Sequence, residues 1–229
     1  MRRIVIVGVS STANMVYNFI TRYTLYDVVG FAVNESYKDV DVFCGLPVFS
    51  LETLESIINK ETDYLFVAIQ WNNLNADRRR VFEGLKQYGY KFANLISPNA
   101  IVNGQIKGEN CWVCDQVVID SGAILRDNTF VKTGAYIADN VHVGPHCFIG
   151  ARSLIAGGVK VGEQTFVGLS ATIFDDVVIG DKCIVGATTA VKRNLDNYSV
   201  IKTSIANYEI RNYTEEVIES KLQFKKNVR

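Results

Sequence analysis

The sequence predicts a small parallel α/β sheet followed by a parallel β-helix, with a short helix at the C-terminal end. Three observations support this prediction. Apolar strand and helix patterns alternate in the first half, an aliphatic residue recurs at every sixth position over 113–191, and 208–224 carries apolar side chains on one helical face. Hydrophobic periodicity is the main structural signal in a single sequence. We therefore expect a sheet domain over 1–96, a coil domain over 97–205 and a tail over 206–229.

Short apolar runs in the first half are separated by helical patterns. Each run is nearly continuous, as a parallel strand with both faces buried requires, and the runs lie at 3–8, 27–33, 64–69 and 92–96. The helices carry apolar side chains at spacings of three and four residues and lie at 12–24, 51–59, behind the N-cap Ser50, and 76–88. This alternation predicts a Rossmann-like parallel sheet with helices outside, which binds ligands at the carboxyl ends of its strands.

The end of the first strand is a candidate phosphate site. Gly8 is followed by Ser10 and Ser11 at the start of a helix, where backbone N–H groups attract an anion. The segment is not a complete G-x-G-x-x-G turn, because Ser10 and Ala13 occupy the positions of the second and third glycines. An ordinary strand-to-helix turn therefore remains the alternative.

The second half has a six-residue period. All fourteen positions in steps of six from Val113 to Val191 are Val, Ile or Leu, and glycine follows six of them. Repeats of this length build parallel β-helices, and residues 18 apart then stack about 4.8 Å from one another. We extend the register back to Ile101. Because one coil cannot bury its outer faces alone, we expect self-association, and the three-sided shape favours a homotrimer.

Composition and cysteine placement exclude several classes of function. The 24 basic and 24 acidic residues cancel, which leaves no basic excess for nucleic acid or an anionic membrane. We find no membrane span and no signal peptide, so we expect a cytoplasmic protein.

Cys111 and Cys114 form a C-x-x-C, but Cys111, Cys147 and Cys183 fall in one stack of the coil. Cysteine serves there as a small apolar residue, so we expect no metal.

Motifs in both halves resemble a known family. The segments GGVKVGEQTFVG at 157–168 and IGDKCIVGA at 179–187 resemble the hexapeptide acyltransferases, which have a left-handed parallel β-helix. In the first half, the resemblance rests on IVGVSS, on NES at Asn34, on GLPV at 45–48 and on ANLISPNAIV at 93–102. Together they resemble the sialic acid O-acetyltransferase and bacillosamine N-acetyltransferase family. That family acylates sugars, often nucleotide-linked, for bacterial surface glycans.

The resemblance implies two binding sites. Acetyl-CoA would lie in a cleft between two β-helices of a homotrimer, and the N-terminal domain would hold the nucleotide of a nucleotide-linked sugar. The residues that we expect to bind CoA are Phe148, Gly157, Gly158, Asp175, Lys192 and Arg193. The residues that we expect to bind the nucleotide sugar are Gly8, Ser10, Ser11, Asn34, Gln70, Trp71 and Asn72. For Lys192 and Arg193, a solvated basic turn is the alternative.

The catalytic histidine of the family is missing. Asp139 stands in its place, and Asn140 replaces its acidic partner. Three readings remain open. Asp139 accepts the proton or binds the sugar, His146 or His142 serves from another face or another subunit, or the acceptor is an amine that needs only positioning. Of the two histidines, His146, next to Pro145 at a turn, is the better candidate.

The leading hypothesis is a sugar N-acyltransferase. It would transfer acetyl from acetyl-CoA to the amino group of a nucleotide-linked deoxysugar by direct attack on the thioester, without an acyl-enzyme. One alternative is a sugar O-acetyltransferase. The other is a non-catalytic β-helix subunit that binds a sugar nucleotide, a reading favoured by Asp139 and Asn140 at the positions of the missing pair.

Overall fold

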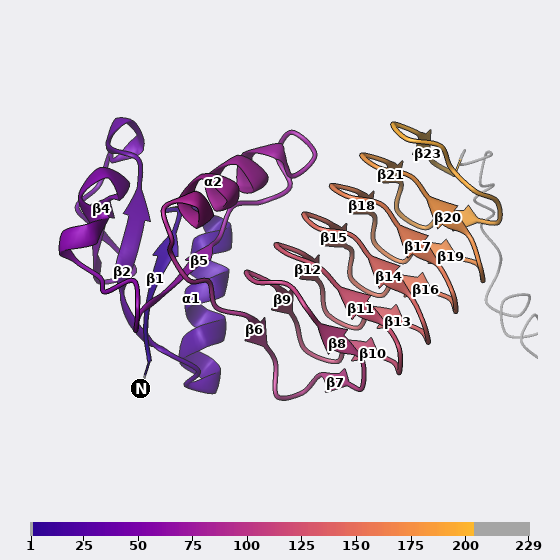
Figure 1. Ribbon diagram of the computed structural model, residues 1–229, viewed down its shortest axis with the longest axis horizontal. Helices are drawn as coiled ribbons and strands as arrows, with labels where there is room; N and C mark the ends of the chain where they lie inside the picture. Colours follow the sequence, from indigo (N-terminus) through magenta and orange to yellow (C-terminus); the bar gives the residue numbers. More distant parts are fainter. Residues whose placement is uncertain (1, 204–229) are drawn as a thin grey trace, which may run out of the picture.

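The computed structural model describes residues 2–203, which form a small α/β sheet and a long three-sided β-helix (Figure 1). The predicted fold class, with its parallel sheet followed by a left-handed parallel β-helix, is confirmed. The C-terminal helix that we expect over 206–229 lies outside the described residues. None of the helices within 2–203 has the length and apolar character needed to cross a membrane.

The N-terminal sheet has the strand order β3-β4-β2-β1-β5. Its strands are β1 (Arg3–Val7), β2 (Asp27–Val33), β3 (Val42–Phe43), β4 (Leu46–Ser50) and β5 (Tyr64–Val67). β1 lies between β2 and β5 and is parallel to both. The chain therefore leaves β1 toward one side and later returns on the other, and such a switch point opens a crevice at the carboxyl ends of the strands.

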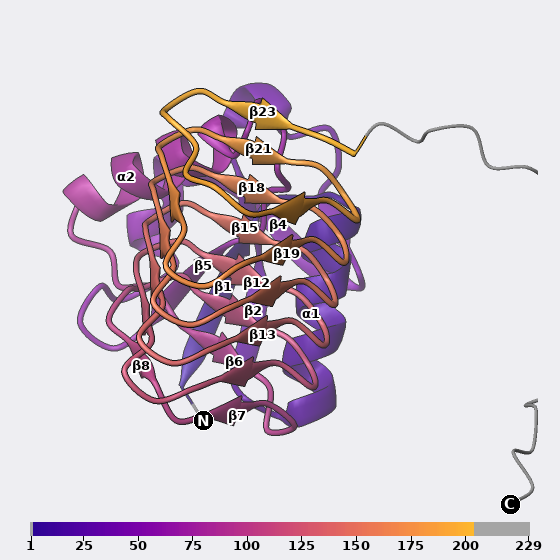
Figure 2. The same ribbon diagram turned by 90° about the vertical axis from the view of Figure 1, so that its right-hand side faces the viewer.

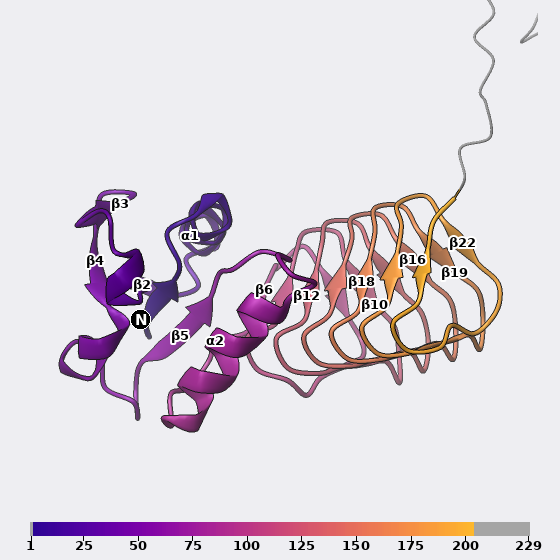
Figure 3. The same ribbon diagram turned by 90° about the horizontal axis from the view of Figure 1, so that it is seen from above.

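Two helices cover opposite faces of this sheet. α1 (Ser11–Tyr23) buries Val16 and Ile20 against one face, whereas α2 (Ala76–Gln87) buries Phe82 against the other (Figure 3). Successive residues of β1 alternate between these two cores, as the two-residue period of a strand requires. The sheet is thus buried on both sides, which explains why its strands read as continuous apolar runs.

One predicted helix of this domain is wrong, and strands β3 and β4 were not predicted. The helix expected over 51–59 is only a 3₁₀ helix, Leu51–Ser56, after a short one at Glu35–Tyr37. It ends early because the side chains of Asn59 and Asp63 accept backbone N–H groups of the next turn and so compete with helix continuation. Strand β4 was not predicted, since it contains a proline, which cannot donate to a strand ladder.

The predicted strand over 92–96 divides between the two parts of the chain. Phe92 forms a single bridge with Leu65 of the N-terminal sheet. β6 (Leu95–Ile96) instead pairs with β9 (Trp112–Val113) in the coil. The polypeptide therefore passes from the sheet to the β-helix within three residues, and the two parts lie directly against each other (Figure 1).

The β-helix has three parallel sheets, which we call sides 1, 2 and 3 in chain order around each coil (Figure 2). Side 1 contains β6, β9 (Trp112–Val113), β12 (Phe130–Val131), β15 (Phe148–Ile149), β18 (Phe166–Val167), β21 (Ile184–Val185) and β23 (Val200–Ile201). Side 2 contains β7 (Ile101–Val102), β10 (Val118–Ile119), β13 (Tyr136–Ile137), β16 (Leu154–Ile155), β19 (Thr172–Ile173) and β22 (Ala190–Val191). Side 3 contains β8 (Gln105–Ile106), β11 (Ile124–Leu125), β14 (His142–Val143), β17 (Lys160–Val161) and β20 (Val178–Ile179).

The predicted six-residue register is confirmed from Val113 to Val191. All fourteen aliphatic positions point into the coil and are buried, and residues 18 apart pair in adjacent coils, for example Val131 with Ile149. The extension to Ile101 is wrong by one residue. Val102 pairs with Ile119 and packs against the coil core, whereas Ile101 is 56% exposed.

A second six-residue period appears in the turns. One residue in each turn has a positive φ, at every sixth position from Asn110 to Thr188, and three of these residues are glycines. The others are largely Asn, Gln and other polar residues, and asparagine in particular tolerates the left-handed region. His146, with a φ of 61°, occupies one of these turn positions. The histidine thus stands where the coil geometry requires a left-handed residue.

We expect Gly150→Ala and Gly84→Ala to change stability in opposite directions. A Cβ at Gly150 would lie 2.6 Å from the backbone carbonyl carbon of Gly168 in the next coil, whereas a Cβ at Gly84 in α2 meets nothing within 4 Å. Forcing the coils apart should lower the free energy of unfolding by about 1–3 kcal/mol, and the helical alanine should raise it by about 0.5–1 kcal/mol. Urea unfolding measures both, and equal stabilities of the two variants would contradict this view of coil packing.

Candidate functional site

A crevice lies at the carboxyl ends of β1, β2 and β5. It has a volume of about 700 Å³, and Gly8, Asn34, Asn73, Asp77 and Arg80 are among its lining residues. Gly8 donates its backbone N–H to the carbonyl of the β2 residue Ala32 at 2.8 Å. Of the seven residues expected to bind a sugar nucleotide, the structure thus brings Gly8 and Asn34 together in one cavity.

The other five expected residues lie around or beyond the rim. Ser10 and Ser11 are exposed at the start of α1, and the Gln70 amide donates to the Ser11 hydroxyl at 3.4 Å. Asn72 is exposed, and Trp71 packs on the β-helix instead of lining the crevice.

Sequence reasoning missed Asp77 and Arg80 as lining residues of the crevice. The run of three arginines could have pointed to α2, but it does not show which helical face meets the crevice. Successive helical residues point about 100° apart, so the three arginines have different environments. The Arg80 side chain is 76% exposed and pairs with Asp77 at 3.1 Å. Arg79 forms ion pairs with Glu83 and with Glu163 of the coil, both at 2.9 Å.

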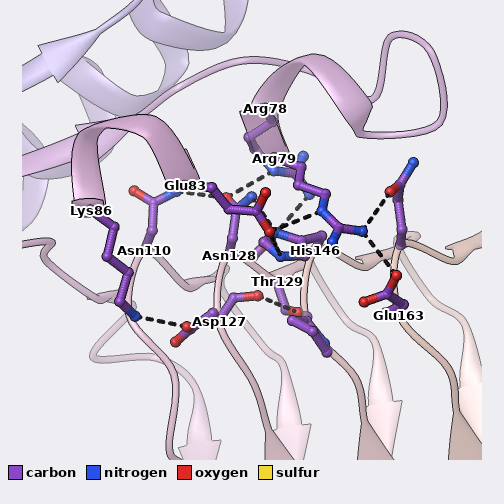
Figure 4. A network of polar contacts seen from close by, with 12 residues as sticks. Arg78, Arg79, Glu83, Lys86, Asn110, Asp127, Asn128, Thr129, His146 and Glu163 are labelled. Atoms are coloured by element: carbon purple, nitrogen blue, oxygen red, sulfur yellow. Dashed lines mark hydrogen bonds and ion pairs between the residues drawn. The ribbon is translucent and has the colours of Figure 1, made fainter. Parts of the chain in front are cut away.

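Arg78 is fully buried between α2 and the coil (Figure 4). Its guanidinium donates to the side-chain oxygen of Asn128 at 3.1 Å and to the backbone carbonyls of Asn128 and Cys147 at 3.2 and 3.1 Å. It also lies 4.0 Å from the centre of the Phe130 ring. Loss of hydration lowers the pKa of Arg78 to about 9. The guanidinium therefore joins the two parts of the chain.

His146 belongs to the same buried junction. It is 4% exposed, its Nδ1 lies 3.0 Å from the Asn128 amide nitrogen, and its Nε2 lies 3.3 Å from a Glu83 carboxylate oxygen. Asn128 in turn accepts from Asn110, whose side chain bonds to the backbone of Val67 in β5. Burial, and then the nearby Arg79, lower the pKa of His146 to about 4. The imidazole is therefore neutral at pH 7, and it donates from Nε2 and accepts at Nδ1.

This buried histidine predicts loss of stability in mild acid. The neutral ring is favoured in the folded protein, so the unfolded chain binds the proton more readily between the ordinary pKa of 6.5 and the folded value of about 4. The free energy of unfolding should be unaffected above pH 6.5 and should fall by up to about 3 kcal/mol as the pH drops to 4. Urea unfolding at several pH values measures this loss. The variant His146→Gln copies the glutamine found at Gln164 one coil later. Its free energy of unfolding should fall less steeply with decreasing pH, and identical pH slopes for the two proteins would contradict the assignment.

His142 has a different environment. It faces outward from side 3 and is exposed. It lines an open groove of about 420 Å³, together with Arg126, Lys160 and Asp181. The two histidines thus lie in separate places, since His146 is covered by α2 and His142 is not.

The corner between sides 2 and 3, which we call corner 2, holds Asp139. In this corner Asp139, Gly157 and Asp175 stack in successive coils, and the Gly157 N–H donates to an Asp175 carboxylate oxygen at 3.1 Å. The backbone carbonyl of Asp139 accepts from Gly158 at 3.0 Å, and the Asp139 side chain is exposed. The position of Asp139 therefore leaves its carboxylate accessible.

The two glycines of corner 2 differ in the space around them. Gly158 has a φ of 71°, and a Cβ there would collide with the Asp176 carboxylate. A Cβ at Gly157 would meet only ordinary contacts, at 3.5 Å from Asp175 and 3.7 Å from Asp139. Packing in the coil thus favours glycine at 158 and places no such constraint on 157. The bare backbone at Gly157 therefore leaves room for a ligand beside Asp139.

Of the two basic residues expected to bind CoA at the end of this corner, Lys192 contacts another side chain of the coil. Lys192 lies over the Phe174 ring, with its Nζ 5.1 Å from the ring centre. Arg193 is exposed.

An aromatic ladder covers the outside of side 1. Trp112, Phe130, Phe148 and Phe166 pair in successive coils, and Phe148 and Phe166 stack in parallel with 5.1 Å between ring centres. Trp71 covers them, at 4.8 Å from Phe148 and 6.1 Å from Phe166. Phe148 is consequently only 6% exposed. Corner 2 lies between sides 2 and 3, so the residues expected to bind CoA occupy two separate surfaces of one chain.

The coil cysteines are structural. Burial raises the pKa of both Cys111 and Cys147 to about 12, so neither forms a thiolate nucleophile near neutral pH. Within the described residues, no three His, Cys, Asp or Glu side chains are grouped as a metal site would need.

Two family models match the coil. Residues 122–157 match the bacterial transferase hexapeptide of six repeats, and residues 158–193 match the hexapeptide repeat of succinyl-transferase. The search of curated proteins gives no match.

Several solved structures share the fold over most of the chain. One is a histidine-to-asparagine variant of perosamine N-acetyltransferase from Caulobacter crescentus, crystallised with CoA and GDP-perosamine. It is 29% identical, with a TM-score of 0.77, over 86% of this chain and 91% of that one. The acetyltransferase domain of PglB from Neisseria gonorrhoeae, crystallised with acetyl coenzyme A, is 20% identical, with a TM-score of 0.76, over 87% and 95% of the two chains. WeeI from Acinetobacter baumannii is 17% identical, with a TM-score of 0.74, over 87% and 96%.

The two hexapeptide matches and these neighbours show that the chain is an acyltransferase, and they make it similar to the class of hexapeptide-repeat acyltransferases. Within that class it is similar to the sugar N-acetyltransferases that carry an α/β domain before the β-helix, as the sequence motifs indicated.

Proposed function

We propose that this enzyme transfers an acetyl group from acetyl-CoA to the amino group of a nucleotide-linked deoxysugar. The observation that carries the proposal is the likeness, at 29% identity over most of both chains, to an enzyme crystallised with CoA and GDP-perosamine. The crevice at the carboxyl ends of the sheet strands supports it, because such a crevice is the usual nucleotide site of a parallel sheet. We place the reaction in the cytoplasm, in the synthesis of surface glycans.

The crevice would hold the nucleotide. Gly8, Ser10 and Ser11 would face its phosphates at the start of α1, where backbone N–H groups favour an anion. Asn34 and Gln70 would contact the base or ribose, and Arg80, exposed at the crevice, adds a positive charge for the diphosphate.

The active site would form between two copies of the chain in a homotrimer. The crevice is lined by the sheet domain, and the loop that leaves it carries Trp71, which packs on side 1. Asp139 lies at corner 2, between sides 2 and 3, so we assign the crevice and the base of one active site to different copies of the chain. A neighbouring copy that places its corner 2 against side 1 would bring Gly157, Gly158 and Asp175, with acetyl-CoA, next to that side. Phe148, which lies beneath Trp71, would hold the Trp71 ring in place rather than touch CoA. Exposed apolar side chains near corner 2 offer a contact surface for that copy. They are Tyr136, Leu154, Phe174 and Val178.

Asp139 would take the proton of the acceptor. The neutral amine attacks the thioester carbonyl, so a C–N bond forms and the C–S bond breaks. The nitrogen becomes acidic once it is bonded to that carbon, and a carboxylate is then a sufficient base. Asp139 would pass the proton to the departing sulfur, which leaves as the free thiol of CoA. Arg193 and Lys192, at the end of the same corner, would face the CoA phosphates.

Neither histidine fits this role as well. His146 is covered by α2 and held on both ring nitrogens, and His142 lies outside corner 2 in a groove on side 3. The exposed Asp139 stands next to the open backbone of Gly157. The replacement of the usual histidine by Asp139 also favours a second candidate function, a non-catalytic subunit that binds a sugar nucleotide.

A transfer assay distinguishes these functions. The protein is incubated with acetyl-CoA and a panel of UDP-, GDP- and dTDP-linked amino sugars while thiol release is followed. We expect release with at least one amino sugar and a product that resists mild base, as an amide does. A base-labile product would indicate O-acetylation, and binding of CoA without thiol release would support the non-catalytic function.

Light scattering after size exclusion tests whether the protein is a trimer. A monomer would contradict an active site shared between two copies.

A further inference from the structure

We propose that Trp71 is the platform on which the sugar ring of the acceptor stacks. This inference rests on the proposed function, because it assigns the sugar-binding residue of that same site. Trp71 is 44% exposed although its ring packs on Phe148 and Phe166. It therefore presents an open aromatic surface that is held in place from below.

The position of Trp71 identifies what covers this surface. Ile69 and Asn73, two residues before and two residues after Trp71, both line the nucleotide crevice. Since consecutive Cα atoms are about 3.8 Å apart, the Trp71 backbone lies within roughly 8 Å of both of these residues. A sugar joined to a nucleotide through a diphosphate extends outward from the crevice by a short distance. The surface of Trp71 is thus where the sugar, rather than the base, would arrive.

The chemistry of the surface suits a deoxysugar. A pyranose carries C–H groups on its ring faces, and a deoxysugar carries an additional apolar group in place of a hydroxyl. Aromatic rings bind such apolar faces by burial and by the negative charge of their π surface. Trp71 and the partly exposed Phe166 supply this surface on side 1, the side that the neighbouring copy would approach with its Asp139. The stacked sugar would lie between the nucleotide crevice and the base.

The loop that carries Trp71 is strained, which a mere packing contact does not require. Asn73, Leu74 and Asn75 all have positive φ values, of 49°, 53° and 64°, and a left-handed conformation costs a bulky residue such as leucine roughly 1–2 kcal/mol. Asn75 is fully buried, and neither polar atom of its side-chain amide has a hydrogen-bond partner. Strain and unsatisfied polar groups gather at functional sites, where the surrounding structure maintains them.

Tryptophan fluorescence reports on this surface directly. The chain has two tryptophans, and Trp112 is buried at 3% exposure, so a ligand that stacks on the protein surface acts on Trp71. We expect GDP-perosamine, or the equivalent UDP- or dTDP-linked amino sugar, to change the emission more than the matching free nucleotide does. The difference should vanish in Trp71→Phe. Equal responses to every sugar nucleotide and its free nucleotide would overturn the proposal.

Kinetics provide the second test. Trp71→Ala should raise the KM for the sugar nucleotide about tenfold, while the KM for acetyl-CoA and the affinity for the free nucleotide stay unchanged. Trp71→Phe should restore most of the loss. Met15→Ala, which removes an apolar side chain of similar exposure on α1, is the matched control and should change none of these constants.

The outcomes separate this inference from the proposed function. An active Trp71→Ala enzyme with an unchanged KM for the sugar nucleotide, or with a raised KM for acetyl-CoA alone, would overturn the platform and leave the acyl transfer standing. A wild-type protein that shows the sugar-dependent emission change but transfers no acetyl group would support the platform and overturn the proposed transfer.

Discussion

Asp139→Asn is expected to lower kcat by a hundredfold or more, with the KM values for both substrates nearly unchanged. The amide has nearly the shape of the carboxylate but cannot accept the proton of the attacking amine, and a positioned general base contributes roughly 10²–10⁴ in rate. Because the Asp139 side chain is exposed at a corner of the coil, the substitution should not disturb folding. Steady-state kinetics, with thiol release as the signal, measure the change.

Variants at three other positions serve as controls. Asp120 also lies near corner 2, one coil earlier, where it accepts from the Tyr136 hydroxyl. Asp120→Asn therefore tests whether catalysis depends on the overall negative charge near corner 2 rather than on Asp139 itself. We expect this substitution to change kcat less than about threefold. His142→Gln and His146→Gln should likewise retain turnover. A hundredfold loss in either histidine variant, together with an active Asp139→Asn enzyme, would reverse the assignment of the base.

Arg78→Ala is expected to destabilise the protein by about 3 kcal/mol or more, because each buried acceptor left without its donor costs about 1–3 kcal/mol. The guanidinium serves the Asn128 side chain and the backbone carbonyls of Asn128 and Cys147, in a place that water does not reach. The melting temperature should fall by roughly 6–12 °C. Arg78→Lys should restore little of this loss, since an ammonium group lacks the planar fork that reaches all three acceptors.

Arg80→Ala is the matched control, two residues further along the same helix. Its side chain is 76% exposed and pairs with Asp77 on its own helix, so the free energy of unfolding should change by less than about 0.5 kcal/mol. Thermal unfolding followed by circular dichroism measures both variants. An Arg78→Ala protein as stable as Arg80→Ala would show that the buried network does not hold the two parts together.

Much of the coil could be predicted from the sequence because its structure is local and repetitive. Each hexad places one aliphatic residue inside, and a repeat of one short strand and a turn leaves few alternatives. The same reasoning failed at the first coil, where Ile101 turned outward. Between the two coils the spacing from Val102 to Ile119 is one residue short of eighteen, and no period detects such a local shift.

The candidate residues on the sheet domain were only partly predictable. The pattern of strands placed Gly8 and Asn34 at the carboxyl ends of their strands, and both line the crevice. Trp71 follows β5 in the same way, yet it packs on the β-helix, and the three left-handed residues after it turn the chain into α2. Non-glycine residues in that conformation leave no clear signal in a sequence.

The sequence by itself determined the class of fold and the stack of Asp139, Gly157 and Asp175, because both follow from patterns of local spacing. The resemblance to the family then implies that the usual histidine is absent from that stack. Only the tertiary structure decided what surrounds the remaining titratable groups. His146 occupies a turn position like every other in the period, and its burial results from the packing of α2 against that corner. That packing joins residues more than sixty positions apart, and a pattern of local spacing carries no information about contacts at such separations.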